Sequence, residues 1–158
     1  MTQVSVICVG KLKESCWREA AAEYAKRLSA YCRLELEELA EERLPENPTE
    51  RQIAAALEAE ADQILPRLEG KTAVALCVEG KPCTSEAFAA MMGREIDGGR
   101  KLAFVIGSSH GLSQRVKSRA DARVSFSALT FPHQLFRVML LEQIYRGFTI
   151  LHGKTYHK

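Results

Sequence analysis

Long apolar runs are missing from this sequence of 158 residues. No stretch approaches the roughly 20 apolar residues that a membrane-spanning helix requires. The apolar run Val4–Val9 is also too short for a signal peptide. Lys11 and Lys13 follow this run, whereas in a signal peptide the positively charged residues precede the apolar region. We therefore expect a cytoplasmic protein without a membrane partner.

Metal and redox spacings are also missing. The five cysteines are odd in number and form no CxxC or Cys/His pattern. Cys8 and Cys77 fall in apolar, strand-like runs, where a free cysteine behaves as a small hydrophobic residue. None of the four histidines shows the spacing with a second histidine and a glutamate that zinc enzymes use. We expect no metal site.

Common nucleotide-binding and hydrolase motifs do not occur either. The segment Val9–Leu12, after the first apolar run, has one glycine and no GxGxxG pattern. Neither a Walker loop nor a GxSxG elbow is found. A pairing of Ser127 with His133 as nucleophile and base has no acid partner that the sequence identifies. These absences count against dinucleotide-binding, NTP-hydrolysing and serine hydrolase functions.

Charge is distributed unevenly along the chain, although the net charge is only +2. Residues 1–99 hold 12 Lys and Arg against 18 Asp and Glu, whereas residues 100–158 hold 10 against 2. A basic segment of this kind favours an acidic partner, and a polyphosphate backbone is the commonest one. A solvated basic face without a partner is the alternative.

Short β-branched or apolar runs alternate with longer helical patterns. The expected strands cover residues 4–9, 34–39, 72–78, 102–106 and 123–126. The expected helices cover 14–31, 51–65, 85–96, 114–120 and a long segment that begins at Pro132, with Thr49 and Ser113 as N-caps. Such alternation is typical of a parallel sheet with helices on both faces. The chain length fits one α/β domain covering residues 1–158.

Glycine and small polar residues follow the last two expected strands. Gly107–Ser113 comes after one strand and Ser127–Phe131 after the next. In parallel sheets ligands bind beyond the carboxyl ends of the strands, so we expect these loops and the one after the third strand to enclose one pocket. Their glycines and small side chains suit a nucleotide-like ligand held by backbone groups.

The last helix is apolar on every side. One stripe contains Leu141 and Phe148, and another contains Leu135 and Met139. A helix of this kind must be covered all round, and the sheet covers only one face. A second copy of the chain is the expected cover, so we predict a homodimer, with packing on the sheet alone as the alternative.

Polar residues gather toward the end of the sequence. His133 and Arg137 are one helical turn apart, as are Glu142 and Arg146. Each pair suits either a surface ion pair or a catalytic role. The chain finishes on Tyr-His-Lys (156–158), residues that have no packing reason to end a chain, although a frayed end is the alternative.

Three segments carry a resemblance to a known family: residues 130–138 (TFPHQLFRV), 141–146 (LEQIYR) and the final 156–158 (YHK). They closely resemble the bacterial methyltransferases that modify N3 of a pseudouridine in large-subunit ribosomal RNA, which belong to the SPOUT superfamily. The similarity covers essentially the whole chain, from Val9-Gly10-Lys11 through Glu79-Gly80-Lys81 to the last lysine.

The resemblance implies a mainly parallel sheet of five to six strands with a deep C-terminal trefoil knot, in a chain that acts as a homodimer. Periodicity gives no sign of the knot. Threaded chains are also so rare that their absence is the default expectation. The resemblance also implies that S-adenosylmethionine lies among three loops. The residues that match those loops are Leu76, Gly107, Phe126, Ser127, Ala128, Leu129, Thr130 and Phe131.

One departure from the family pattern lies in the glycine loop. Relatives usually have a second glycine and then an acidic or amide residue where this chain has Ser108 and His110. Backbone contacts to the methyl donor are expected to survive Ser108. A role for His110 in recognition is open.

The implied reaction is an in-line attack of the target nitrogen on the sulfonium methyl group, which leaves S-adenosylhomocysteine. His157 or His133 is expected to take the N3 proton, with Arg137 stabilising charge and Tyr156 placing the base. One small protomer offers little surface, so the implied partner is 23S ribosomal RNA within the assembled ribosome, and not DNA. Two alternatives stay open: a SPOUT enzyme acting on a ribose hydroxyl or another base, including one in tRNA, and a non-catalytic ribosome-binding factor.

Overall fold

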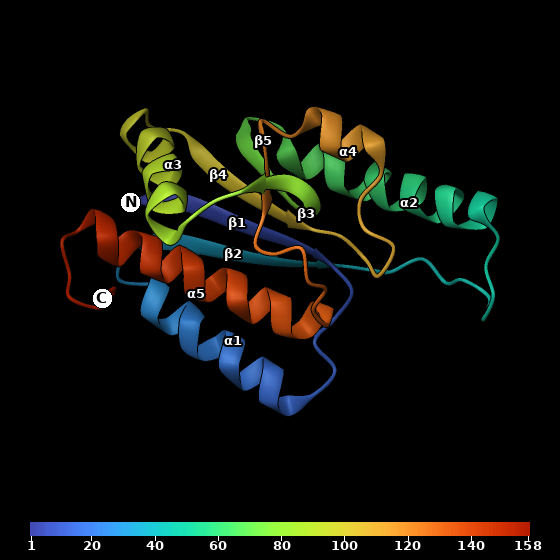
Figure 1. Ribbon diagram of the computed structural model, residues 1–158, viewed down its shortest axis with the longest axis horizontal. Coiled ribbons are helices and arrows are strands. Elements are labelled where there is room, and N and C mark those ends of the chain that lie inside the picture. Colours follow the sequence, from blue (N-terminus) through green and yellow to red (C-terminus); the bar gives the residue numbers. More distant parts are fainter.

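Five segments rich in β-branched and other apolar residues pair as parallel strands in the computed structural model, which describes residues 1–158 (Figure 1). The strands are β1 (Thr2–Val9), β2 (Cys32–Leu39), β3 (Lys71–Pro82), β4 (Lys101–Ile106) and β5 (Ala122–Ser125). Their order across the sheet is β2-β1-β4-β3-β5, and every neighbouring pair is parallel. The predicted parallel α/β sheet is therefore confirmed, with five strands.

Helices connect the strands in the predicted alternation. They are α1 (Ser15–Leu28), α2 (Glu50–Ile64), α3 (Ser85–Asp97), α4 (Gln114–Arg119) and α5 (His133–Leu151), and a short 3-10 turn, η1 (Leu65–Leu68), follows α2. Two predicted N-caps are confirmed: the Thr49 hydroxyl accepts the Gln52 amide at 3.2 Å, and the Ser113 hydroxyl accepts the Val116 amide at 3.3 Å. No helix combines the length and apolar character that crossing a membrane requires.

Strand β3 extends beyond the predicted end at Val78. Its pairing with β5 is interrupted between Leu76 and Lys81, and Lys81 then pairs with the same residue, Val124, that Leu76 pairs with. Gly80 makes this bulge possible, since a Cβ there would lie 2.6 Å from the Val124 carbonyl carbon. The Glu-Gly-Lys-Pro composition of residues 79–82 hid this pairing from the sequence pattern.

Alternating residues of the central strands supply two cores. Val4 and Val6 of β1 point into a core shared with α1, α3 and α5, whereas Ile7 points into a second core shared with α2 and α4. Figure 1 shows α1 and α5 running side by side along one face of the sheet, with α2 and α4 grouped away from them. Burial on both faces explains why these strands read as continuous apolar runs.

Helix α5 packs against both α1 and α3 as well as against the sheet. Leu141 and Phe148 are buried, and Tyr31, which follows α1, stacks on Phe148 with 5.6 Å between ring centroids. On the α3 side, a Cβ at Gly147 would lie 2.9 Å from the Met92 sulfur. Neighbouring helices of the same chain therefore cover much of the apolar surface from which the sequence predicted a homodimer.

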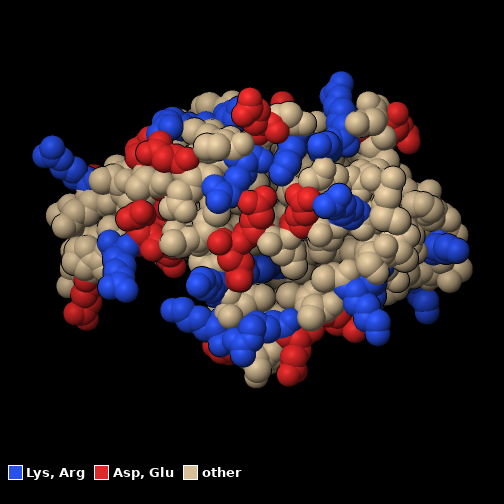
Figure 2. All heavy atoms as spheres, turned by 180° about the vertical axis from the view of Figure 1, so that it is seen from behind, with Lys and Arg blue, Asp and Glu red and all other residues tan.

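Some cations of the basic second half of the sequence pair with acids of the first half. Arg115 pairs with Glu58 and Asp62 of α2, and Lys117 pairs with Glu79. Accordingly, Figure 2 shows acidic and basic side chains intermixed on the face it displays. Folding thus offsets part of the charge asymmetry along the chain.

Candidate active site

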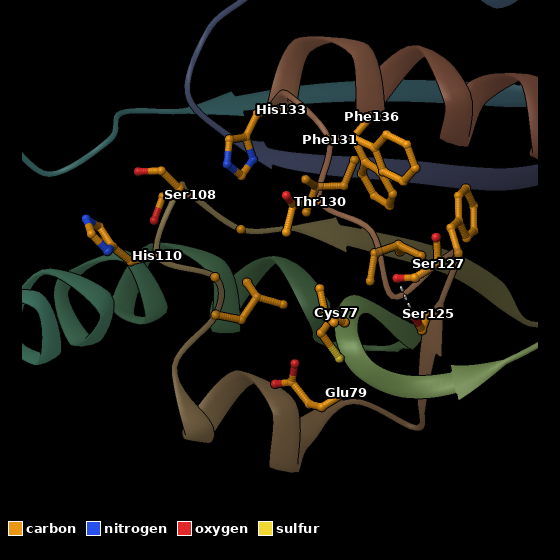
Figure 3. Close-up of a pocket in the computed structure, with 18 of the residues that line it drawn as sticks. Cys77, Glu79, Ser108, His110, Ser125, Ser127, Thr130, Phe131, His133 and Phe136 are labelled. Atoms are coloured by element: carbon orange, nitrogen blue, oxygen red, sulfur yellow. Dashed lines mark hydrogen bonds between the residues drawn. The ribbon is translucent and has the colours of Figure 1, made fainter.

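A cavity of about 290 Å³ lies at the carboxyl edge of the sheet (Figure 3). Its walls are the bulged part of β3 (76–79), the loop after β4 (106–112), the segment 125–131 around the end of β5, and side chains of α4 and α5. The predicted pocket beyond the strand ends is therefore confirmed. Of the residues matched to donor loops, those that line it are Leu76, Gly107, Phe126, Ser127, Leu129, Thr130 and Phe131. Ala128 is exposed and lies outside the lining.

The loop after β4 turns so tightly that it requires glycine at its first position. A Cβ on Gly107 would lie only 2.2 Å from the carbonyl oxygen of Gly111. Gly111 has a φ of +86°, which favours glycine, and its amide donates to the Ser108 carbonyl at 2.8 Å. This closed turn presents main-chain atoms to the cavity, as expected from the glycine spacing.

The segment after β5 is shaped by short hydroxyl contacts and an aromatic cluster. The Ser125 hydroxyl donates to the Ser127 carbonyl at 3.1 Å, and the Leu129 amide donates to the Ser127 hydroxyl at 3.0 Å. Phe136 packs against Phe126, with 5.1 Å between ring centroids, and against Phe131 at 6.4 Å. One side of the cavity is therefore apolar and aromatic, a surface that suits a flat heterocycle.

An ion pair between Glu79 and Lys117 lies on another side of the cavity. The hydrogen bond from Lys117 holds the pKa of the Glu79 carboxyl below its usual range. Cys77 lies beside Glu79, and partial burial raises the pKa of its thiol, which favours the protonated form. The cavity thus offers one anionic and one cationic side chain close together, besides its apolar wall.

His133 is the one expected catalytic residue that lines this cavity. It opens α5, and Figure 3 shows its imidazole on the same side of the cavity as Ser108. The first turn of α5 is tied to the loop after β1, because the side-chain oxygen of Gln134 accepts the Lys13 amide at 3.0 Å. The imidazole is therefore carried by an anchored element.

Arg137 points away from the cavity. Its guanidinium donates to Glu38 at 2.6 Å and to the Gly10 carbonyl at 2.8 Å, and its side chain is 7% exposed. Burial works to raise the pKa of Glu38, but hydrogen bonds from Arg137 and the Leu12 amide outweigh it, so the pKa lies below the usual range. Within one protomer, Arg137 joins α5 to the ends of β1 and β2.

Tyr156 and His157 fold back onto α5 and the start of α3. The Tyr156 hydroxyl donates to Glu142 at 3.2 Å, and burial, followed by its neighbours Tyr24 and Glu142, raises its pKa to about 12. The two ring nitrogens of His157 contact Arg146 at 3.1 Å and Glu86 at 2.7 Å. The structure therefore does not bring the tail and His133 into one cavity of the chain.

A second cavity of about 280 Å³ adjoins these tail contacts. Glu142, which binds the tail, lines it together with Gln143 and Met139 of α5 and residues at the start of α3. Phe126 lines both cavities. One aromatic residue is therefore shared by the cavity beyond the strand ends and the cavity beside the tail.

Sequence reasoning missed several residues that line the first cavity. Glu79 and Lys117 are separated by 38 positions in sequence, so no local pattern linked them. Phe136 lies in the segment 130–138 that carries the family resemblance, but the sequence assigned it no role. The position of Glu79, immediately after an apolar run, was the one available signal, since side chains at strand ends face such cavities. Among its acids, histidines and cysteines the structure has no cluster of three that would hold a metal ion.

A parallel sheet covered by helices, with a cavity over its strand ends, defines the class of α/β proteins whose ligands bind at that edge of the sheet. The family model described as "Predicted SPOUT methyltransferase" matches residues 2–157. The chain belongs to this SPOUT methyltransferase family.

Relatives and a solved structure agree with this membership. A protein of Clostridium botulinum (strain Kyoto / Type A2) is 47% identical over 157 residues, which cover 98% of this chain and 99% of that protein. One of Caldicellulosiruptor saccharolyticus is 47% identical over 156 residues, with the same coverage. Both bear the name ribosomal RNA large subunit methyltransferase H. The crystal structure of a probable methyltransferase from Bordetella pertussis Tohama I has the same fold, with a TM-score of 0.59 at 17% identity over 92% of this chain and 94% of that one.

The tight loop at Gly107 yields a stability prediction. Gly107→Ala is expected to lower the free energy of unfolding by about 1 to 3 kcal/mol, because the added methyl group must displace Gly111. Urea denaturation at neutral pH measures the change. Gly98→Ala is the matched control, because the nearest atom to its added Cβ would be the Arg94 carbonyl oxygen at 3.3 Å, much farther than the 2.2 Å at Gly107. Equal losses in the two variants would contradict the proposed close approach.

Proposed function

We propose that this chain transfers a methyl group from S-adenosylmethionine to N3 of a pseudouridine in 23S ribosomal RNA. The cavity built from three strand-end segments carries the proposal, since it exposes main-chain atoms beside an aromatic wall. Relatives that bear a large-subunit rRNA methyltransferase name and align over nearly the full chain support the substrate class. A protein that methylates ribosomal RNA acts where the ribosomes are, so we also propose a cytoplasmic location.

The lining residues fit the chemistry of this donor. The aromatic and aliphatic wall suits an adenine ring, and the main chain of the loop after β4 offers partners for its polar edge. Glu79 and Lys117 match the ammonium and carboxylate groups of an amino acid. When bound, the donor supplies a methyl group already activated on a sulfonium centre. The protein therefore has mainly to hold and orient the donor and to exclude water, because the methyl group needs little further activation.

His133 is the protein group best placed to take the N3 proton. It lines the cavity at the anchored start of α5, and a neutral imidazole is an effective base near neutral pH. Arg137, bound to Glu38 and Gly10, orients this turn of α5 in our proposal instead of contacting developing charge. His157 and Tyr156 act only if the tail leaves Glu86 and Glu142 or reaches the site of a second protomer.

A homodimer with a C-terminal trefoil knot is part of the proposal. Leu135, Val138 and Met139 of α5 stay only half-buried within the protomer, and Leu129 is 70% exposed beside the cavity. A partner seated here would cover apolar surface and shield the cavity from water. The mass of the protein in solution, measured by light scattering, checks the dimer.

Cations without a carboxylate partner mark a surface for RNA. Lys81, Arg94 and Arg123 are exposed and line one groove of about 840 Å³ between α3 and the edge strand β5. The groove floor contains apolar residues such as Met91 and Phe88, and Phe88 also lines the second cavity. Free cations over an apolar floor suit a strand of nucleic acid, whose phosphates and bases need both.

The function is tested with methyl-labelled S-adenosylmethionine and three RNA substrates: 70S ribosomes, a short hairpin containing the target pseudouridine, and tRNA. We expect label in large-subunit RNA of ribosomes, as 3-methylpseudouridine by mass analysis of nucleosides, and little in the other two. Ribose methylation or labelled tRNA would favour another SPOUT activity. A wild-type protein that gives no binding heat with the donor would be a non-catalytic factor.

The histidine assignment is tested by substitution. His133→Ala is expected to lower kcat by about 100-fold or more at saturating donor, because the N3 proton then lacks an acceptor. His152→Ala serves as control, since this ring contacts the Phe148 carbonyl and lies outside the cavity. A large loss in His157→Ala with normal turnover in His133→Ala would move the base to the tail. Normal turnover in both variants and in the double variant would refute histidine catalysis.

The groove is tested by removing its three charges together, as Lys81→Gln, Arg94→Gln and Arg123→Gln. Ribosome binding is expected to weaken, and the slope of log affinity against log salt to become shallower by about 2, because roughly 0.7 counterions are released per neutralised phosphate of a single strand. Lys26→Gln, Arg43→Gln and Arg51→Gln remove the same charge from exposed positions elsewhere. Equal effects of the two triple variants would mean that only net charge matters.

A further inference from the structure

Glu60 of α2 is a buried carboxylate in contact with the donor cavity's glycine loop. It is 4% exposed, and no lysine, arginine or histidine pairs with it. One carboxylate oxygen accepts the Ser108 hydroxyl at 2.9 Å, and the other accepts the Glu42 amide at 3.1 Å. Ser108 is itself 4% exposed. The two contacts join helix α2, the loop after β4 and the segment that leaves β2.

This arrangement is a poor way to gain stability. Burial raises the pKa of Glu60, and the nearby charges of Glu41 and Glu42 raise it further, while the two hydrogen bonds oppose them. The adjacent residues Ala61 and Ile64 belong to an apolar core, where an aliphatic side chain would pack without a desolvation cost. A buried, unpaired acid at such a position calls for a role other than packing.

The loop that Glu60 holds has few other ties. Within the loop, the Gly111 amide closes the turn on the Ser108 carbonyl. Outward, the loop's other side-chain bond runs from the exposed Ser109 hydroxyl to Glu41 at 3.4 Å, which is long for a hydrogen bond between a hydroxyl and a carboxylate. The Ser108–Glu60 contact is thus the shorter of the two side-chain hydrogen bonds that tie this loop to other elements, beside the packing of Leu112 in the core.

We propose that Glu60 is a positioning residue for the methyl donor, which it serves by fixing the main chain of residues 107–111 through Ser108. The inference rests on the proposed function, because the ligand in question is S-adenosylmethionine or its demethylated product. The serine that departs from the family's glycine pattern is the residue through which Glu60 acts. Preorganised backbone groups bind a ligand more tightly because less ordering remains to be done on binding.

The first test measures the affinity for S-adenosylhomocysteine by calorimetry, well below the unfolding temperature. Ser108→Ala is expected to weaken binding about tenfold, the effect of losing one hydrogen bond to a charged group. Ser108→Thr keeps the hydroxyl and should restore much of the affinity, and Ser118→Ala, at an exposed position of α4 outside the cavity lining, is the matched control with little effect. The KM for ribosomes should stay unchanged in all three, because the RNA surface is elsewhere.

The second test uses Glu60→Gln, which preserves both contacts: the amide oxygen accepts from Glu42, and the amide nitrogen donates to Ser108. Donor affinity should stay within about twofold of wild type. Because the Glu60 pKa is higher in the folded than in the unfolded state, its stability contribution is greatest at low pH and is lost as pH rises through the folded pKa. The stability of Glu60→Gln relative to wild type should therefore grow as the pH rises from about 4, near the ordinary pKa of glutamate, to neutrality.

The outcomes separate this inference from the function on which it rests. A wild-type protein that binds no S-adenosylhomocysteine would overturn the proposed function. If wild type binds and Ser108→Ala binds equally well, the positioning role is wrong while the function stands. A flat difference in stability between Glu60→Gln and wild type across that pH range would likewise contradict the description of Glu60 as a buried, destabilised carboxylate.

Discussion

The parallel pairing of all five strands is the constraint on which the site depends. Parallel strands place their carboxyl ends at one edge of the sheet, so segments from distant parts of the sequence must meet there. The register of β3 with β4, Leu76 opposite Ile106, sets the first of these meetings, and the pairing of Leu76 with Val124 of β5 sets the second. Hydrogen bonds of the sheet thereby fix the distances between loops that have little regular structure of their own.

The two faces of the sheet contribute differently to the site. Helix α5, packed between α1 and α3, brings His133 and Phe136 to the cavity from one side. Helices α2 and α4 approach from the other side, where Glu60 holds the glycine loop and Lys117 holds Glu79. A cavity at a sheet edge can thus be controlled by both layers of helices. Of these two acids, Glu79 pairs with a cation and Glu60 accepts from a hydroxyl.

Much of this architecture was readable from the sequence, because it follows from local periodicity. The strand and helix order, the caps at Thr49 and Ser113, and the glycine loop at Gly107 all have local signatures. The bulge at Gly80 did not, since its cause is the backbone of β5, some 44 residues away at Val124. The place of Arg137 was missed for the same reason: its spacing from His133 suggested a shared site, but Glu38 and Gly10 draw the guanidinium inward. Pairings between distant residues, unlike propensities, leave no pattern in one sequence.

Phe126 lines two cavities, the one at the strand ends and the one beside the tail. Its ring lies against Phe88 and Phe136 and forms a partition common to two chambers. Because this side chain belongs to both linings, a change of its rotamer would alter the shape of both cavities. One aromatic residue is therefore common to the strand-end cavity and to the cavity lined by Glu142, the acid that accepts the Tyr156 hydroxyl.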